Sequence, residues 1–381
     1  MCIVVVCIIL SLGLSPFRIP KNQVQWSPQR DGVQFGVYGT IRGQRELTAI
    51  GSRDGSIELW VLPTRWSDSA TVVAVYQRKE RSVFKLHQSL TNLEIEYEHE
   101  NGGWRPSLTR LMVPEAFRPA LRRREPVFLT VTSGANGMAV YVNGNLARNG
   151  PAFPFDGALS GTLIVGDAPR QPDSFRGKIG GLAIYSAELS AADVSADYRR
   201  WAQYDGPDVS AIRPYLALYL FNEGAGRVIH NHAGPAGVLV IPEKYTVLDK
   251  IALEPFWTEF DLTEEYWRGN LKNVIGFVPV GFVFYAYFAI ARRMRRPVLL
   301  TIMVGLLISF TIEGLQAFLP TRDSGTTDIL TNTIGTWLGV LFFQMLPHQV
   351  HFFRETPQPS TLTLSGSAAS DDNQRYPGGH G

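Results

Sequence analysis

Apolar residues gather into long runs near the two ends of the chain. Residues 1–17 contain no charged side chain, and further apolar runs occupy 271–291, 298–319 and 329–346. Each of these later runs is close to the ~20 residues that a helix needs to cross a bilayer. Helices in the core of a soluble protein would show a polar face, which these runs lack. The pattern therefore predicts an integral membrane protein with several transmembrane helices.

Between the apolar ends, the chain has the pattern of a β protein. Short runs of β-branched and aromatic residues are separated by Gly, Asn, Asp and Pro, and Asn143-Gly144 is a typical hairpin turn. One helix is expected over 190–201, where Ser190 can cap the N-terminus. This spacing predicts an all-β sandwich. The expected strands are 56–63, 70–78, 82–89, 92–100, 126–133, 137–145, 162–168, 177–189 and 215–222.

A basic loop between two of the apolar runs sets the expected orientation. It contains Arg292, Arg293, Arg295 and Arg296. Short basic loops stay in the cytoplasm. We therefore expect the part before Leu271 to lie outside the plasma (inner) membrane and the C-terminus to be cytoplasmic. The first run is then either an uncleaved anchor, which its lack of a clear cleavage site favours, or a cleaved signal peptide.

These patterns divide the chain into successive parts. An aromatic belt before the second apolar run, with Trp257, Tyr266 and Trp267, is typical of a membrane interface. The C-terminal tail is rich in Pro, Ser, Gly and Asp and need not fold. The predicted parts are an N-terminal anchor or signal (1–17), an extracytoplasmic domain (18–242), an interfacial linker (243–270), a transmembrane domain (271–346) and a disordered tail (347–381).

Composition changes this picture little. The 36 Lys and Arg residues nearly balance the 34 Asp and Glu residues, so the net charge of +2 gives no reason to expect nucleic acid as a partner. The mean hydropathy of −0.01 averages a water-soluble part and a lipid-soluble part. Both cysteines lie in residues 1–17, so the outer domain is expected to fold without disulfides.

Polar residues follow single stripes along two of the predicted transmembrane helices. Ser309, Glu313 and Gln316 share one face of a helix because they are spaced by four and three residues. A buried carboxyl group is costly unless it is paired, so these groups are expected to converge. They are candidates either for chemistry or for hydrogen bonds that only hold helices together. The second stripe consists of Asp328, Asn332, Gly335 and Gly339, in which the glycines form a small-xxx-small packing face.

The outer domain resembles a known family. The segments L-T-V-T-S-G-A-N-G-M-A-V-Y-V-N-G, L-I-V-G-D and F-R-G-K-I-G-G-L-A-I-Y-S are similar to the laminin-G-like, concanavalin A-like jelly roll over about 56–201. The resemblance implies an all-β jelly-roll sandwich. Domains of this family bind sugars, bind proteins or hydrolyse glucans, and the fold does not choose among these activities.

One strand tests the hydrolase alternative. In E-I-E-Y-E, Glu94, Glu96 and Glu98 share one face of the strand, and the segment resembles the E-x-D-x-E strand of jelly-roll glucanases. Strand geometry separates Glu94 from Glu98 by roughly 13 Å, whereas a retaining pair lies about 5–5.5 Å apart. We therefore expect a half-buried strand with a solvated acidic face. No cofactor is expected, although Asp156, Asp167 and Asp173 are weak candidates for calcium ligands.

The C-terminal part resembles a second family. The segments N-V-I-G-F-V-P-V-G-F, S-F-T-I-E-G-L-Q and D-I-L-T-N-T-I-G are similar to the VanZ-like membrane family over about 270–346. With residues 1–17 as first helix, the resemblance implies an α-helical transmembrane bundle of about four helices that carries the jelly roll as an insertion. By its name the family is associated with glycopeptide-antibiotic resistance. The candidate catalytic residues are Glu313, Arg322 and Asp328, and the candidate binding residues are Asn273, Gln316 and Asn332.

Two classes of function follow. In the first, which the sequence favours, the protein is associated with the cell envelope and its jelly roll binds a glycan or a protein. In the second, the cluster of Glu313, Arg322 and Asp328 binds or acts on a lipid-linked envelope molecule, with Glu313 as acid or base and Arg322 holding an anionic head group. The expected partners are therefore membrane lipid and an envelope glycan or lipid-linked precursor, and an enzymatic activity is left open.

Overall fold

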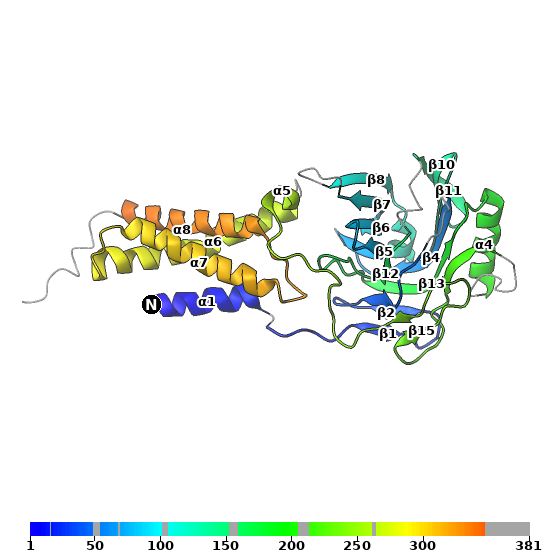
Figure 1. Ribbon diagram of the computed structural model, residues 1–381, viewed down its shortest axis with the longest axis horizontal. Coiled ribbons are helices and arrows are strands. Elements are labelled where there is room, and N and C mark those ends of the chain that lie inside the picture. Colours follow the sequence, from blue (N-terminus) through cyan, green and yellow to red (C-terminus); the bar gives the residue numbers. More distant parts are fainter. Residues whose placement is uncertain are drawn as a thin grey trace, which may run out of the picture.

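The protein consists of a β-sandwich and a helical bundle arranged end to end (Figure 1). The computed structural model describes residues 1–15, 17–48, 54–67, 69–100, 106–151, 159–204, 213–260 and 264–346. The predicted combination of an all-β jelly-roll sandwich with C-terminal helices is confirmed.

Two antiparallel sheets form the sandwich. The outer sheet lies far from the bundle and contains β1 (Val24–Trp26), β2 (Val33–Phe35), β13 (Gly177–Tyr185), β4 (Gly55–Pro63), β9 (Val127–Gly134), β10 (Gly137–Val142) and β11 (Asn145–Gly150) in that order, with β14 (Tyr215–Tyr219) also paired to β13. The bundle-facing sheet contains β15 (Val228–Ile229), β16 (Leu239–Val240), β3 (Ile41–Gly43), β12 (Thr162–Val165), β5 (Ala70–Gln77), β6 (Ser82–Ser89), β7 (Asn92–His99) and β8 (Ser107–Val113).

The core lies between the sheets, and a helix covers the far side of the outer sheet. In β9, Val127, Leu129 and Val131 enter the core, while Phe128 packs on Trp201 of α4 (Ala191–Tyr204) with ring centroids 5.9 Å apart. Every residue of β9 is therefore buried, because both of its faces are covered. Helix α2 (Arg118–Arg123) forms a short connection ahead of this strand.

The hairpin turn between β10 and β11 follows its sequence signal. Asn143 and Gly144 both have positive φ angles, 52° and 75°, as a type I′ turn requires. The strand predicted over 137–145 therefore ends at Val142, and β11, which follows the turn, lies almost wholly beyond the predicted range.

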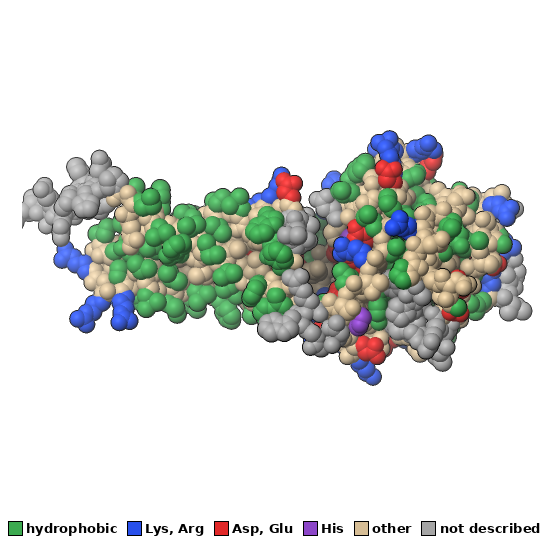
Figure 2. Space-filling model, turned by 90° about the horizontal axis from the view of Figure 1, so that it is seen from above, with side chains coloured by type: hydrophobic (Ala, Val, Ile, Leu, Met, Phe, Trp, Pro, Cys, Tyr) green, Lys and Arg blue, Asp and Glu red, His purple; other side chains and the backbone are tan. Residues whose placement is uncertain are grey.

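The bundle contains α1 (Cys2–Leu14), α6 (Glu264–Ala286), α7 (Pro297–Gln316) and α8 (Thr326–Met345), and α6 continues into a π-helical turn over Tyr287–Ala291. Among the described residues, two helices are long and apolar enough to cross a membrane, Tyr266–Ala291 and Pro297–Gln316. Hydrophobic side chains cover the visible side of the bundle (Figure 2). That α1 and α8 also cross the membrane stays a prediction.

Glycines allow α6 and α8 to pack backbone to backbone. A Cβ atom added at Gly335 would lie 2.2 Å from the carbonyl oxygen of Val274, and one at Gly339 would lie 2.1 Å from that of Val278. The small-xxx-small face predicted at Gly335 and Gly339 is thus the contact surface between these helices.

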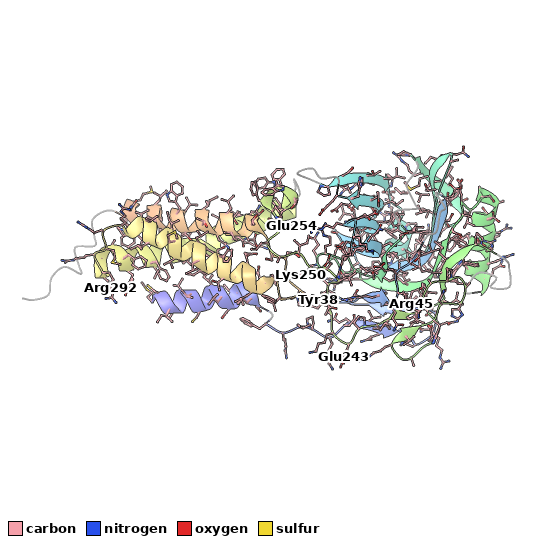
Figure 3. All side chains as sticks on the ribbon, viewed as in Figure 1. Tyr38, Arg45, Glu243, Lys250, Glu254 and Arg292 are labelled. Carbon is pink, nitrogen blue, oxygen red and sulfur yellow. The ribbon has the colours of Figure 1, made fainter. Side chains whose placement is uncertain are left out.

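The linker between sandwich and bundle is hydrogen bonded to both. On the sandwich side, Tyr76 donates its hydroxyl proton to Asp249 at 2.5 Å. On the bundle side, the amide of Glu254 donates to the carbonyl of Ser324 at 2.8 Å, and Lys250 donates to carbonyl groups at the C-terminal end of α7. Lys250 and Glu254 lie at this junction, just before the short helix α5 (Phe256–Glu259), and Arg292 lies at the opposite end of the bundle (Figure 3).

Candidate functional site

The residues predicted on the transmembrane helices surround one cavity of about 250 Å³, here called the bundle cavity. Side chains from α1, α6, α7 and the loop and helix that follow α7 line it. The polar residues on its walls are Lys272, Asn273, Glu313, Gln316, Arg322, Asp328 and Asn332. The structure thus brings together all six candidates and adds Lys272, which the sequence had not singled out.

Glu313 is the most buried carboxylate of the bundle cavity, with 1% of its surface exposed. Its Oε2 accepts a hydrogen bond from the backbone amide of Gly325 at 2.9 Å. Ser324 donates its hydroxyl proton to the main-chain carbonyl of Glu313 at 2.9 Å. These bonds tie the start of α8 to α7, because Gly325 is the residue that precedes α8.

Two further pairs join neighbouring helices across the cavity. Asn273 of α6 donates from Nδ2 to Oδ1 of Asp328 in α8 at 2.7 Å. Asn332 of α8 donates from Nδ2 to the hydroxyl of Ser309 in α7 at 2.9 Å. The amide oxygen of Asn332 is buried and has no hydrogen-bond partner among the described residues.

The first helix closes one side of the bundle cavity. Gln316 donates from Nε2 to the carbonyl of Gly13 at 2.7 Å, and Arg322 donates from Nε to the carbonyl of Ser15 at 2.9 Å. These donors satisfy carbonyl groups at the C-terminal end of α1, which a helix leaves without internal partners. The amide oxygen of Gln316, Oε1, is buried and unpartnered within the described part of the chain.

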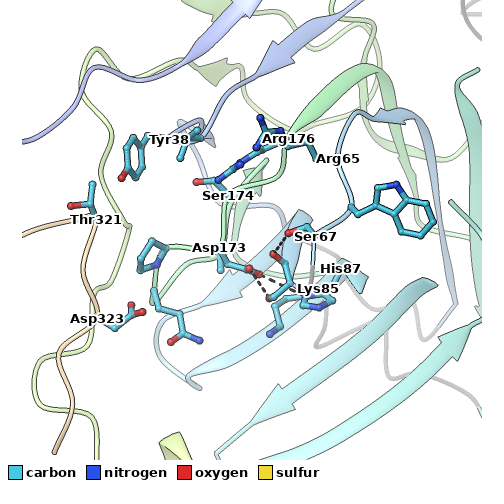
Figure 4. A pocket seen from close by; sticks show the side chains of 16 residues that line it. Tyr38, Arg65, Ser67, Lys85, His87, Asp173, Ser174, Arg176, Thr321 and Asp323 are labelled. Atoms are coloured by element: carbon cyan, nitrogen blue, oxygen red, sulfur yellow. Dashed lines mark hydrogen bonds and ion pairs between the residues drawn. The ribbon is translucent and has the colours of Figure 1, made fainter. Parts of the chain in front are cut away.

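A larger cavity of about 610 Å³ lies between the bundle-facing sheet and the loop that joins α7 to α8. We call it the interface cavity. Figure 4 shows Thr321 and Asp323 of the α7–α8 loop across from Lys85, His87 and Asp173 of the sandwich. Tyr38, Arg65, Trp66 and Arg176 complete its main polar and aromatic lining.

Asp173 is the best anchored side chain of the interface cavity. Its carboxylate accepts hydrogen bonds from the hydroxyls of Ser69 at 2.7 Å and Thr71 at 2.5 Å, and Nδ1 of His87 lies 3.7 Å away. Burial alone would raise the pKa of Asp173, but the hydrogen bonds and the nearby His87 lower it on balance. Within the cavity, desolvation raises the pKa of Asp323 to about 6, against the opposing effect of Lys250.

Two of the candidate calcium ligands are neighbours. Oδ1 of Asp167 accepts a hydrogen bond from the backbone amide of Asp173 at 2.9 Å, and burial raises the pKa of Asp167 to about 7. The third candidate, Asp156, lies outside the described residues. Within those residues, no group of three or more His, Cys, Asp or Glu side chains could hold a metal ion.

The prediction of a solvated acidic face on β7 was wrong. Glu94 and Glu96 are buried, with 8% and 3% of their surfaces exposed. Lys85 of β6 lies 2.9 Å from Glu96, and Arg110 of β8 lies 2.6 Å from Glu96 and 3.4 Å from Glu94. Burial favours the protonated form of Glu96, but these cations lower its pKa overall.

The cause is the arrangement of neighbouring strands. Lys85 and Arg110 lie directly opposite Glu96 in the paired strands, so their side chains neutralise it across the sheet. Glu98 is paired separately, with Arg170 at 3.4 Å. A hydrolytic acid and nucleophile would have to face substrate, whereas Glu94 and Glu96 face the cations of neighbouring strands.

Fold and cavities together define a membrane-associated protein with a lectin-like sandwich and a polar-lined helical bundle. Residues 36–195 match the concanavalin A-like lectin/glucanases superfamily, and residues 219–347 match VanZ/LLP1. The chain therefore carries a concanavalin A-like domain followed by a VanZ/LLP1 family region, which confirms both resemblances. The VanZ/LLP1 match begins in β14, so it also takes in the last strands of the sandwich.

Solved structures are similar to part of this chain at low sequence identity. A protein from Bacteroides ovatus ATCC 8483, described as carbohydrate binding, is 12% identical over 60% of this chain and 62% of its own, with a TM-score of 0.38. The heptameric SAP-like pentraxin from Limulus polyphemus is 15% identical over 51% of this chain and 82% of its own, with a TM-score of 0.33.

The sialidase CBM40 of Ruminococcus gnavus is 16% identical over 44% of this chain and 95% of its own, with a TM-score of 0.33. The 62% of the B. ovatus protein that this chain covers is less than two thirds of that protein's length. No curated protein matches the chain.

Proposed function

We propose that this protein is a multi-pass membrane protein of the cell envelope that binds a glycan in the interface cavity. The observation that supports the proposal is the cavity itself, about 610 Å³ in volume and lined by charged, hydroxyl and aromatic side chains. Ligand sites of this kind combine an enclosing concave surface with a few convergent polar groups.

The lining matches the chemistry of a sugar. Sugar hydroxyls both donate and accept hydrogen bonds, and Asp173, Lys85 and His87 supply acceptors and donors on the sandwich side. Trp66 supplies an aromatic face, with 57% of its surface exposed, on which the C–H face of a sugar ring can pack. A lectin-like domain that bears these groups fits glycan binding better than hydrolysis, since Glu94 and Glu96 are already neutralised.

We also propose the orientation that the sequence predicts. The arginine loop lies at the end of the bundle farthest from the sandwich, as the position of Arg292 in Figure 3 indicates. Short loops rich in arginine are retained in the cytoplasm. The sandwich is then extracytoplasmic. Trp257 and Trp267, which are exposed, lie near the extracytoplasmic surface of the plasma membrane. Alkaline phosphatase fused after residue 346 should be inactive; activity there would contradict this orientation.

Glycan binding is tested on the full chain in lipid nanodiscs. A broad glycan array should give hits, and Trp66→Ala should weaken each hit by about tenfold, equal to ~1.4 kcal/mol. Trp267→Ala is the matched control, because Trp267 is similarly exposed, at 53%, but does not line the interface cavity. An array without hits, or equal losses for the two variants, would count against the proposed site.

A further inference from the structure

The inner wall of the bundle cavity is rich in hydrogen-bond acceptors. Oδ1 of Asn332 and Oε1 of Gln316 are buried without partners among the described residues, and these side chains are only 4% and 8% exposed. The carboxylates of Glu313 and Asp328 line the same cavity. A buried acceptor without a donor costs ~1–3 kcal/mol. A ligand with several N–H donors and a positive charge would satisfy this wall.

Cations line the same cavity. Arg322 donates to the carbonyl of Ser15 at the end of α1, so its guanidinium group is held beside the first helix. Lys272, near the outer end of α6, is exposed and also lines the cavity. Arginine and lysine are the usual partners of phosphate oxygens in proteins. The cavity therefore offers separate partners for a negative and for a positive group.

Apolar side chains provide the rest of the lining. Ile9 and Leu12 of α1, Phe277 of α6 and Ile312 of α7 border the cavity. Leu12 is 67% exposed on the surface of the bundle, so the cavity adjoins a face that lipid chains would cover. A volume of about 250 Å³ is sufficient for a small head group and insufficient for a whole lipid.

We propose that the bundle cavity binds the head group of a zwitterionic phospholipid that carries a primary amine, with the phosphate at Arg322 and Lys272 and the ammonium group at Glu313, Asp328 and the unpartnered oxygen of Asn332. The acyl chains remain outside, against α1 and α7. This site is distinct from the interface cavity, so it stands whether or not the sandwich binds a glycan.

The test compares lipids that differ only in the head group. Full-length protein, purified in detergent and freed of lipid, is titrated with phosphatidylethanolamine, phosphatidylglycerol and phosphatidylcholine of identical chains, and bound lipid is counted by native mass spectrometry. Phosphatidylethanolamine is expected to bind about tenfold more tightly than the other two, because only it combines a phosphate with N–H donors. Equal binding of the three lipids would overturn the proposal.

Variants assign the two halves of the head group. Glu313→Gln should remove the preference for phosphatidylethanolamine over phosphatidylglycerol, whereas Arg322→Gln should weaken both lipids by a similar factor. Glu264→Gln is the matched control, since Glu264 also lies in the bundle but its side chain is 80% exposed. If Glu313→Gln does not fold, Asp328→Asn serves the same purpose. A retained preference in every folded acid variant would refute the site.

A soluble probe separates a lipid from a free zwitterion. Phosphoethanolamine carries both charged groups but no acyl chains, so it should compete with phosphatidylethanolamine at least about tenfold less well. Equally strong competition would show that the ligand is a small soluble molecule and would overturn the assignment to a lipid.

Discussion

The contact between α6 and α8 gives a prediction whose size follows from the structure. Gly339→Ala would place a Cβ atom 2.1 Å from the carbonyl oxygen of Val278, 2.7 Å from the amide nitrogen of Phe282 and 2.9 Å from Cα of Gly281. All of these are backbone atoms, so no side chain can rotate away. The added methyl group therefore has to push the two helices apart.

The added methyl group requires a large displacement of α8 away from α6. Ordinary contact begins near 3.4 Å, so α8 must move from α6 by about 1.3 Å at this point. Overpacking of this kind costs ~1–3 kcal/mol. The hydrogen bond of 2.7 Å between Asn273 and Asp328 spans the same helix pair, and a similar displacement would stretch it beyond useful length.

The matched control is Gly314→Ala in α7, because a Cβ atom at Gly314 meets nothing within 4 Å. Ala is favoured over Gly inside a helix by ~1 kcal/mol, so this variant should be neutral or more stable. Because Gly339→Ala gains the same helix preference, thermal unfolding of both variants in the same detergent should separate them by the overpacking cost alone, ~1–3 kcal/mol. Equal unfolding temperatures would refute the close backbone contact of α6 and α8.

Two further predictions concern buried charge in the sandwich. Burial and the nearby Asp197 raise the pKa of Glu58. The contribution of Glu58 to the free energy of unfolding is therefore greatest below the ordinary carboxylate pKa near 4.5 and is lost as the pH rises through the raised value. The free energy of unfolding falls by up to ~1.4 kcal/mol per pH unit in this range. Glu58→Gln should flatten this fall in the unfolding temperature between pH 5 and pH 8; an unchanged slope would contradict it. Lys85→Met should lower the free energy of unfolding by about 3 kcal/mol, because it leaves buried Glu96 with a single cation. The double variant with Lys85→Met and Glu96→Met should recover much of this loss, as measured by denaturant titration. A double variant as unstable as Lys85→Met would show that the pair is not the cause.

The sequence was sufficient for the long strands and for the helical bundle. Alternating and β-branched runs such as 56–63 and 82–89 became β4 and β6 with almost the same bounds. The strands that were missed mostly contain two or three residues, as in Val228–Ile229, too few for any periodicity to be visible. The exceptions are β8, Ser107–Val113, whose sequence does not alternate apolar and polar residues, and β11, Asn145–Gly150, which is mostly polar and exposed.

The two cavities differ in how far the sequence could reach them. Residues of the bundle cavity recur every three or four positions along helices, and that spacing places them on one face without knowledge of the tertiary structure. The interface cavity combines distant segments, such as Trp66, Lys85, Asp173 and Thr321. The fold of the sandwich brings the first three together, and only its docking onto the bundle adds Thr321. The error at Glu96 is also non-local, since the cations that pair with it lie on the neighbouring strands β6 and β8.

One short loop contributes to both cavities, and this determines how variants in it must be interpreted. Thr321 and Asp323 line the interface cavity, whereas Arg322 between them lines the bundle cavity. A change at Arg322 that releases the loop from Ser15 would move its neighbours too, and glycan binding would weaken even if Arg322 never touches a sugar. Lower glycan affinity in Arg322→Gln is therefore no evidence for a sugar contact. The loss of lipid preference in Glu313→Gln is the cleaner readout for the bundle cavity, because displacement of the loop has no reason to distinguish an ethanolamine head group from a glycerol one.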